Sequence, residues 1–520
     1  PSEPAGPSKN SGGVDLAGTQ TMMMPYGMIP LHFAWLPIIP LIVVAIGAIV
    51  VLMAGVHVRD DESEGLGWLA IVFLAIAFLF ALGLIGKHGI AFDGALAIDG
   101  FAAFFELVIL ISAAVTILMS LEYAVEAGFS GAEYYALILF ATLGMMLMAT
   151  GDDLIVIFLG LEMMSVAVYV LAGFMRRNLR SNEAALKYFV MGAFSTGFLL
   201  YGIALIYGAT GTIKLGPVKA ALTHPVASSP LLLSGIGLLL IGFGFKVAAV
   251  PFHMWTPDVY EGSPTPITGF MAVGIKLGAF AGFLRIFMVH LTPVSMHWSW
   301  VLWIVAALTM SAGNVLAIVQ SNIKRMLAYS AIAQAGYVLV GMTVVRAQAG
   351  GAILYFLLGY AFTTLGAFAV VVALDRAGEG GDRIRDYRGL ALRHPALAAL
   401  MALFLLSFTG VPPLAGFMGK FYVFAAALNA GFIGLVIIAV INSVVSAYYY
   451  IYVIVQMYTQ EGGIEVVRMS RRPALMAALA VAIIGTIVIG IYPAPYMAAA
   501  AHAFNSALGA APVHTALAIR

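Results

Sequence analysis

Apolar stretches of about twenty residues follow one another along almost the whole chain, and they restrict the fold more than any other feature of the sequence. A helix needs about 20 apolar residues to cross the hydrocarbon core of a bilayer. Only 9% of the 520 residues are charged, whereas a soluble domain has about 25%. The sequence therefore predicts an all-α polytopic membrane protein.

Fourteen windows have the length and hydropathy of a transmembrane helix. Their approximate bounds are 30–54, 66–86, 100–120, 133–150, 153–175, 184–208, 230–255, 265–290, 298–319, 326–345, 350–374, 396–425, 430–458 and 473–497. Pro251 lies inside the seventh window, and Pro412 and Pro413 lie inside the twelfth. Because proline removes a backbone donor and disturbs the preceding turn, we expect helices 7 and 12 to be broken.

Basic residues are distributed unevenly between the two sets of predicted loops. The loops after odd-numbered helices contain fourteen, namely Arg59, Arg176, Arg177, Arg180, Lys324, Arg325, Arg376, Arg383, Arg385, Arg388, Arg393, Arg468, Arg471 and Arg472. The opposite side contains six, namely Lys9, Lys87, Lys214, Lys219, Arg346 and Arg520. The positive-inside rule then predicts that the odd loops face the cytoplasm and that both termini face the periplasm.

The remaining basic residues fall inside predicted spans. They are Lys187, Lys246, Lys276, Arg285 and Lys420. A lysine at the centre of a membrane helix costs about 3 kcal/mol on insertion scales, so such residues are typical of functional sites. Lys246 and Lys420 each lie beside a predicted break, and non-helical backbone at membrane depth is tolerated where it faces protein or water. We therefore expect a hydrated interior around these two lysines.

One acidic residue, Glu162, falls near the bilayer midplane. An isolated carboxylate at that depth needs a cationic partner to stay charged, and we expect Lys246 to be that partner. Lys187 lies four residues after Glu183, the favourable order for an ion pair on a helix. Lys187 is thus interpreted either as a residue that reaches the cytoplasmic interface or as a functional group.

Several other polar residues allow more than one interpretation. Arg285, near the end of helix 8, is expected to be an interface anchor, while Asp99 and Glu106 belong to an outer access path or are solvated. His253 is a possible proton relay, although a lone histidine is more often a satisfied core residue. The chain has no cysteine, which excludes iron–sulfur clusters held by this chain, and no histidine pair has metal-ligand spacing. No cofactor or metal is expected in the chain itself.

The two predicted breaks are five spans apart, and an odd offset reverses the direction in which a helix crosses the membrane. This pattern is typical of inverted repeats with discontinuous helices at the working sites. We expect a disordered N-terminal extension (1–29), helices 1–3 (30–132), a first repeat of helices 4–8 (133–292), a second repeat of helices 9–13 (298–458), and helix 14 with a C-terminal tail (473–520).

Several segments, among them LEMMSVAVYVLAGF, KVAAVPFHMWTPDVYEG, SNIKRMLAYSAIAQAGY and GVPPLAGFMGKFYVF, resemble the antiporter-like membrane subunits of respiratory complex I, and most of all the subunit N family of bacterial NADH-quinone oxidoreductases. The resemblance covers about residues 90–460. In that family the proton path uses an acid on helix 5 and basic or charged residues on helices 6, 7, 8 and 12. The matching positions are Glu162, Lys187, Lys246, Lys276 and Lys420.

The resemblance implies that the chain is a subunit of a proton-translocating NADH:quinone oxidoreductase in the bacterial inner membrane. Partner subunits would carry FMN and iron–sulfur clusters, the quinone site would lie elsewhere, and neighbouring membrane subunits and lipids would surround the chain. Two alternatives stay open at this point. One is a subunit of a multi-subunit cation/proton antiporter, and the other is a non-conducting scaffold of the membrane arm.

Overall fold

The computed structural model describes residues 38–58, 64–129, 131–223, 225–375, 380–463 and 472–509. The extension predicted at 1–29 lies outside these ranges. So do six of the basic residues used to predict the orientation, namely Lys9, Arg59, Arg376, Arg468, Arg471 and Arg520.

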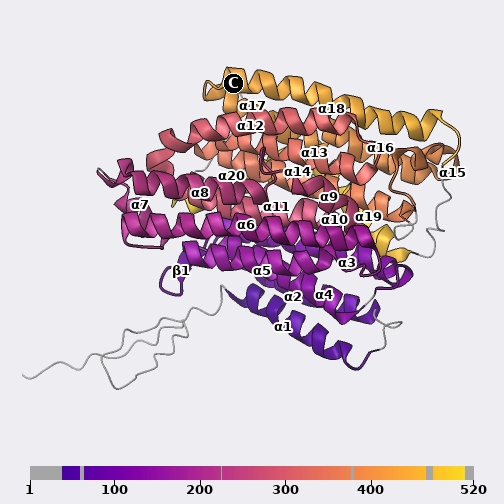
Figure 1. Cartoon of the computed structure of the whole chain (residues 1–520), viewed down its shortest axis with the longest axis horizontal. Helices are drawn as coiled ribbons and strands as arrows, with labels where there is room; N and C mark the ends of the chain where they lie inside the picture. Colours follow the sequence, from indigo (N-terminus) through magenta and orange to yellow (C-terminus); the bar gives the residue numbers. More distant parts are fainter. Residues whose placement is uncertain are drawn as a thin grey trace, which may run out of the picture.

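The described chain is almost entirely helical, as predicted, and its helices run roughly side by side along the long axis of the molecule (Figure 1). Its first part contains α1 (Ile39–Gly55), α2 (Glu64–Leu82), β1 (Gly89–Ala91), β2 (Leu96–Ile98), α3 (Gly100–Glu126), α4 (Ala132–Thr150), α5 (Leu154–Ala172), α6 (Leu179–Thr210), α7 (Leu215–Ala221), α8 (Pro230–Lys246) and α9 (Trp255–Gly262). The two strands form an antiparallel hairpin in which Ile90 faces Ala97.

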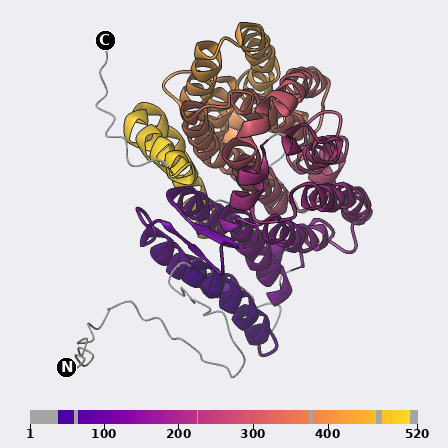
Figure 2. The ribbon, with the colours of Figure 1, turned by 90° about the vertical axis from the view of Figure 1, so that its left-hand side faces the viewer.

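The second part begins with α10 (Thr265–Phe270), a π segment (Met271–Ile275), α11 (Lys276–Leu284) and a second π segment (Arg285–His290). It continues with α12 (Ser295–Ile318), α13 (Ile323–Met342), α14 (Ala347–Leu374), α15 (Leu390–Arg393), α16 (Pro395–Thr409), α17 (Ala415–Asn429), α18 (Ile433–Thr459), α19 (Pro473–Ile491) and α20 (Pro493–Ala507). Viewed along the helices, α1 and α2 lie at one edge of the bundle, and α19 and α20 form another edge (Figure 2).

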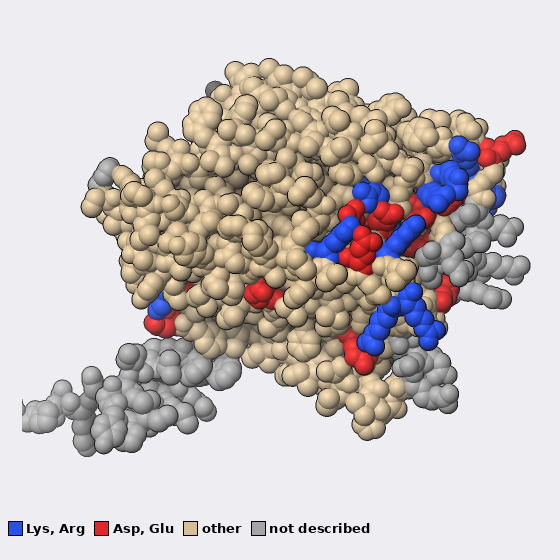
Figure 3. Space-filling view, viewed as in Figure 1, with Lys and Arg blue, Asp and Glu red and all other residues tan. Residues whose placement is uncertain are grey.

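Ten helices of the described residues are long and apolar enough to cross a membrane. The run Thr265–His290 is buried inside the bundle, whereas fewer than half of the residues in the most apolar parts of Leu179–Thr210 and Ile433–Thr459 are buried. In Figure 3 uncharged side chains cover most of the visible face, and acidic and basic side chains gather mainly toward one end, while one acidic side chain shows near the middle. Such a surface suits a protein whose middle lies in hydrocarbon, because only apolar side chains are favourable there.

Several helix boundaries differ from the predicted windows for local reasons. The window 473–497 is divided between α19 and α20, and Pro493 takes the first position of the new helix, where its missing N–H is not needed. Helix α6 begins five residues earlier than predicted, because the Asn178 side chain accepts a hydrogen bond of 2.9 Å from the Arg180 N–H and so caps the helix. In the window 230–255 helix α8 ends at Lys246 and α9 begins only at Trp255, whereas the window 396–425 is divided between α16 and α17.

Candidate functional site

Lys246 is the last residue of α8, and its side chain is 2% exposed. Its ammonium nitrogen donates hydrogen bonds to Ser165 Oγ (2.7 Å) and Tyr169 OH (3.1 Å), both on α5. The same nitrogen lies 5.4 Å from the centre of the Tyr169 ring and 5.7 Å from that of Phe245. Because the C-terminal end of a helix carries partial negative charge, this position stabilises an ammonium group away from bulk water.

The direct pairing expected between Glu162 and Lys246 is wrong for this conformation of the protein. Lys246 contacts hydroxyl groups, and one carboxylate oxygen of Glu162 is buried without a hydrogen-bond partner among the described residues. Glu162 nevertheless lies on the same helix as Ser165 and within electrostatic range of Lys246. Sequence spacing identified the right helices but not which oxygen atoms would fill the space around the ammonium group.

Lys276 is the first residue of α11 and directly follows the π segment Met271–Ile275. Its side chain is 3% exposed, and its ammonium group donates a hydrogen bond to the carbonyl oxygen of Ala331 on α13. The nitrogen lies 5.6 Å from the centre of the Tyr360 ring of α14. Single π turns inside helices are frequent at functional sites, and here the turn lies directly before the buried lysine.

Lys420 lies within α17, after the break at Pro412 and Pro413, and is 4% exposed. Its ammonium group donates to the carbonyl oxygens of Phe408 (2.7 Å) and Thr409 (3.1 Å), the last residues of α16. It also donates to Ser443 Oγ of α18 at 2.9 Å. The lysine therefore satisfies carbonyl groups that the end of α16 leaves without intrahelical partners.

Helix α13 forms a polar connection between Lys276 and Lys420. Ala331 accepts from Lys276, and Gln334, three residues later, donates at 3.4 Å to the same Phe408 carbonyl that accepts from Lys420. The ring of Tyr337, on the next turn, lies 4.8 Å from the Lys420 nitrogen. Lys246 and Lys276 share no hydrogen-bond partner within the described ranges. The structure thus brings Lys276 and Lys420 to one helix and Lys246 to another, α5.

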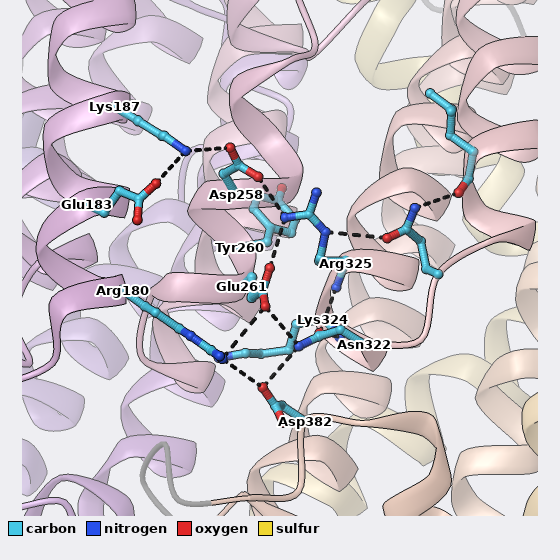
Figure 4. Close-up of polar contacts among 12 residues, drawn as sticks. Arg180, Glu183, Lys187, Asp258, Tyr260, Glu261, Asn322, Lys324, Arg325 and Asp382 are labelled. Carbon is cyan, nitrogen blue, oxygen red and sulfur yellow. Dashed lines mark hydrogen bonds and ion pairs between the residues drawn. The ribbon is translucent and has the colours of Figure 1, made fainter.

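Lys187 belongs to a cluster of ionic groups at one end of the bundle (Figure 4). Its nitrogen lies 2.6 Å from Glu183 Oε1, which confirms the expected pair within α6, and 2.8 Å from Asp258 Oδ2 on α9. Asp258 also pairs with Arg325 of α13 at 2.6 Å. The Lys187 side chain is 40% exposed, so this lysine lies at the edge of the site rather than deep inside it.

The same ionic cluster continues toward the loop after α14. Glu261 of α9 lies 2.9 Å from Arg325 and 3.8 Å from Arg180, and Arg180 lies 3.7 Å from Asp382. Asn322 caps α13 and donates to Asp382 at 3.0 Å. A crevice of about 1750 Å³ opens here and is lined in part by Arg180, Glu261, Asn322 and Asp382. This end of the bundle therefore presents a polar and hollowed surface.

The prediction that Arg285 is an interface anchor is wrong. The side chain is buried and makes two hydrogen bonds to Asp99, from Nη1 at 2.8 Å and from Nη2 at 3.1 Å. It also donates to the carbonyl oxygen of Ala149 from Nε and Nη2. Asp99 is therefore an ion-pair partner inside the protein. The sequence could not indicate this pair, because its members are 186 residues apart.

His253 lies between α8 and α9, two residues after Pro251. Its Nδ1 atom is buried and has no hydrogen-bond partner among the described residues. Since an imidazole nitrogen can both accept and donate a proton, the position is compatible with the possible relay. In the described part of the chain, no three His, Cys, Asp or Glu side chains lie close enough to hold a metal ion.

Most of the hydroxyl, amide and aromatic groups around the lysines were not anticipated from the sequence. Ser165, Tyr169, Gln334, Tyr337 and Ser443 all lie on helices whose other side chains are largely apolar. A signal was present, because polar side chains inside a membrane span are enriched at helix contacts and cavities. The sequence does not show which of the many such residues face a lysine.

Comparison with known proteins decides the family. Residues 151–446 match the family described as "NADH:quinone oxidoreductase/Mrp antiporter, TM". A relative from Trichlorobacter lovleyi, named NADH-quinone oxidoreductase subunit N, is 46% identical over 457 residues, which is 88% of this chain and 94% of the relative. The chain belongs to the NADH-quinone oxidoreductase subunit N family. The resemblance expected from the sequence is thereby confirmed.

Solved structures share the fold of this subunit N family member. A chain of respiratory complex I from Thermus thermophilus matches with a TM-score of 0.75 and 35% identity, over 89% of this chain and all of that chain. A chain of the Mrp complex from Dietzia sp. DQ12-45-1b matches with a TM-score of 0.79 at 21% identity, over 92% of this chain and 98% of that chain. The second likeness shows a common fold and nothing about activity.

Proposed function

We propose that this chain is a proton-translocating membrane subunit of NADH:quinone oxidoreductase. The observation that supports this most is the set of three lysines, Lys246, Lys276 and Lys420, which lie inside the bundle with exposures of 2–4% and with polar partners. Buried lysines in a membrane domain are costly, and where they occur they mark ion pathways and proton relays. The redox reaction takes place on other subunits, which carry FMN and iron–sulfur clusters, and the quinone site lies outside this chain.

In this proposal each buried group has a distinct role. Lys246 alternates between its hydroxyl partners and the carboxylate of Glu162. Lys276 is the central relay, and Lys420 serves the far half of the proton path. Two unit charges about 10 Å apart in an effective dielectric of about 20 interact by about 1.7 kcal/mol. A proton that arrives at one group therefore changes the occupancy of the next. Lys187 and the ionic cluster supply protons from the crevice, and His253 relays them.

The proposal includes a specific topology. Fourteen spans are arranged as helices 1–3, two inverted repeats of helices 4–8 and 9–13, and helix 14. The helices α8 with α9, and α16 with α17, are the two discontinuous spans. Both termini face the periplasm, and the cluster around Arg325 faces the cytoplasm of a bacterial cell. Neighbouring membrane subunits of the same complex and lipids cover the exposed apolar helices.

A cation/proton antiporter subunit is the second candidate, since the description of the family that residues 151–446 match also names the Mrp antiporter. The two candidates differ in their partners. Under the main proposal, the chain isolated in mild detergent retains subunits that contain flavin and iron–sulfur clusters. Isolation with antiporter subunits alone would favour the second candidate. A non-conducting scaffold, the third possibility, predicts that lysine substitutions act only through assembly of the complex.

The decisive test compares Lys246→Ala with Lys87→Ala, because Lys87 lies in an exposed loop after α2. The assembled complex is placed in liposomes, and protons moved per NADH oxidised are measured. We expect Lys246→Ala to abolish translocation through this chain and Lys87→Ala to behave as wild type. A normal proton-to-electron ratio in an assembled Lys246→Ala complex would contradict the proposal.

A further inference from the structure

A second carboxyl group deep in the bundle has no role in the path described so far. Glu106, on the second turn of α3, is 1% exposed. Neither of its carboxylate oxygens has a hydrogen-bond partner among the described residues. A buried carboxylate without partners is strongly unfavourable, so such a group holds a proton or is in contact with internal water. A carboxylate that only stabilises the fold would have a hydrogen-bond or ion-pair partner, and Glu106 has none among the described residues.

The charged groups on the helices around α3 do not neutralise Glu106. Helices α10, α14 and α19 contain no charged residue, and α20 contributes only an exposed histidine. Glu64 and Glu133 lie in the first turns of α2 and α4, at the other end of the bundle. Arg285 and Lys276 remain, on the buried helix run Thr265–His290 that packs against α3.

Arg285 is already occupied by Asp99. Its guanidinium makes two hydrogen bonds to that carboxylate and two to the Ala149 carbonyl. Asp99 caps α3 and lies seven residues before Glu106, and seven residues are almost two full helical turns, so both side chains share one face of α3. The negative charge of Asp99 acts on Glu106 and opposes a second negative charge there.

Helix α3 and the run Thr265–His290 pack in opposite directions, and this arrangement fixes the depth of Glu106 relative to that of Lys276. Asp99 at the start of α3 contacts Arg285, and Tyr123 near the end of α3 shares Asp375 with Thr265, the first residue of α10. At about 1.5 Å per residue, Glu106 lies about 10 Å inward from Asp99, and Lys276 lies about 13 Å inward from Arg285. Glu106 is therefore at a depth between Lys276 and the Asp99–Arg285 pair.

We propose that Glu106 is a proton-carrying group on the exit side of Lys276. The ammonium group of Lys276 transfers one proton, through internal water, to the Glu106 carboxylate, which leaves a neutral amine and a neutral carboxylic acid. Glu106 then releases the proton to water at the Asp99–Arg285 end, and repulsion by Asp99 limits the lifetime of the charged form. This inference rests on the proposed function and gives the chain a proton exit of its own.

The test uses the intact complex with Glu106→Gln, which keeps the shape of the side chain, and with Glu106→Asp, which keeps the acid. Glu64→Gln, at an exposed position in the first turn of α2, is the control. Infrared difference spectra during turnover detect the carbonyl stretch of a protonated carboxylic acid by its shift in D₂O. Protons moved per NADH are measured on the same samples in liposomes.

We expect Glu106→Gln to lose one protonated-carboxyl band and to lower the number of protons moved per NADH, at an unchanged rate of NADH oxidation. Glu106→Asp keeps a band at a shifted frequency, and the control matches wild type. An unchanged band, or an unchanged proton number in Glu106→Gln, overturns the inference. If Lys276→Ala lowers proton transfer and Glu106→Gln does not, only this inference fails. If neither variant lowers it, the proposed function fails as well.

Discussion

Two pairs of helices, α8 with α9 and α16 with α17, are each interrupted by proline, and each has a buried lysine in a different position relative to the interruption. In the first, Lys246 ends the helix that precedes the break, and Pro251 follows it. In the second, the lysine belongs to the helix after the break, because Pro412 and Pro413 precede Lys420. Both ammonium groups nevertheless lie beside the C-terminal end of a half-helix, where the partial negative charge of the backbone favours a cation.

The partners of the two lysines differ in their freedom to move. Lys246 donates to the hydroxyl groups of Ser165 and Tyr169, and the carboxylate of Glu162 is close by. Lys420 donates to two backbone carbonyls at the end of α16 and to Ser443. Hydroxyl groups rotate to suit either a donor or an acceptor, whereas carbonyl groups accept only and are fixed by the backbone.

A buried lysine beside a proline break therefore serves a different purpose in each of the two helix pairs. The surroundings of Lys246 allow the ammonium group to change partners, as a switch requires. The surroundings of Lys420 hold together the two helices on either side of the break, so that lysine also stabilises the fold. Substitutions around Lys420 should therefore lower stability more, and substitutions around Lys246 should lower transport more.

The largest effect on stability is expected from Lys420→Met, compared with Lys246→Met. Without Lys420, the carbonyls of Phe408 and Thr409 lose their charged donor and keep only the longer hydrogen bonds from Gln334 (3.4 Å) and Ser443 (3.2 Å). A hydrogen bond to a charged group contributes about 1.5–3 kcal/mol. Without Lys246, Ser165 still donates to its own helix, so the loss is smaller. The amount of assembled complex and its thermal midpoint measure the difference. Equal stability of the two variants would contradict the comparison.

The next largest effect is expected from the double variant Ser165→Ala with Tyr169→Phe. It removes both hydroxyl partners of Lys246, and hydrogen bonds to a charged group contribute about 1.5–3 kcal/mol each. We expect the Glu162–Lys246 pair to close and proton translocation to fall at least about tenfold, which corresponds to about 1.4 kcal/mol. The fall in translocation is measured as proton uptake into liposomes, and Tyr201→Phe, on the exposed face of α6, is the control.

Ser443→Ala should have a smaller effect than the double variant. Lys420 keeps its two carbonyl partners, so the loss is that of the bond from Lys420 to Ser443 and of the bond from Ser443 to the Thr409 carbonyl, about 1 kcal/mol each. We expect a small decrease in thermal midpoint and nearly normal translocation. A loss of translocation as large as that of the double variant would mean that the Ser443 hydroxyl takes part in proton transfer.

The smallest effect is expected at the ionic cluster at one end of the bundle, in Lys187→Gln. This side chain is 40% exposed and pairs with Glu183 and Asp258, and exposed ion pairs contribute about 0–1 kcal/mol. We expect a modest decrease in the rate of proton transfer at low ionic strength that disappears in high salt, because salt screens exposed charges. A decrease that persists in high salt would place Lys187 among the buried conducting groups.

Much of the site was predictable because its residues violate the local pattern. Lysines and a glutamate within apolar spans, and prolines inside two of those spans, stand out against a sequence in which 62% of residues are hydrophobic. The Glu183–Lys187 pair was predictable as well, since its spacing is local. The direct contact expected between Glu162 and Lys246 is not made in this conformation, and the role assigned to Arg285 was wrong, because both depend on residues of distant helices.

The sequence by itself determined that the chain is a helical membrane protein and that its buried charges are few and costly. Apolar length and charge are properties of each segment, and the bilayer acts on each segment separately. Only the tertiary structure decided which polar atom satisfies each charge: Asp99 for Arg285, hydroxyls for Lys246, and carbonyls for Lys420. The reason is geometric, because hydrogen bonds require atoms to approach within about 3 Å, and only the packing of helices sets such distances.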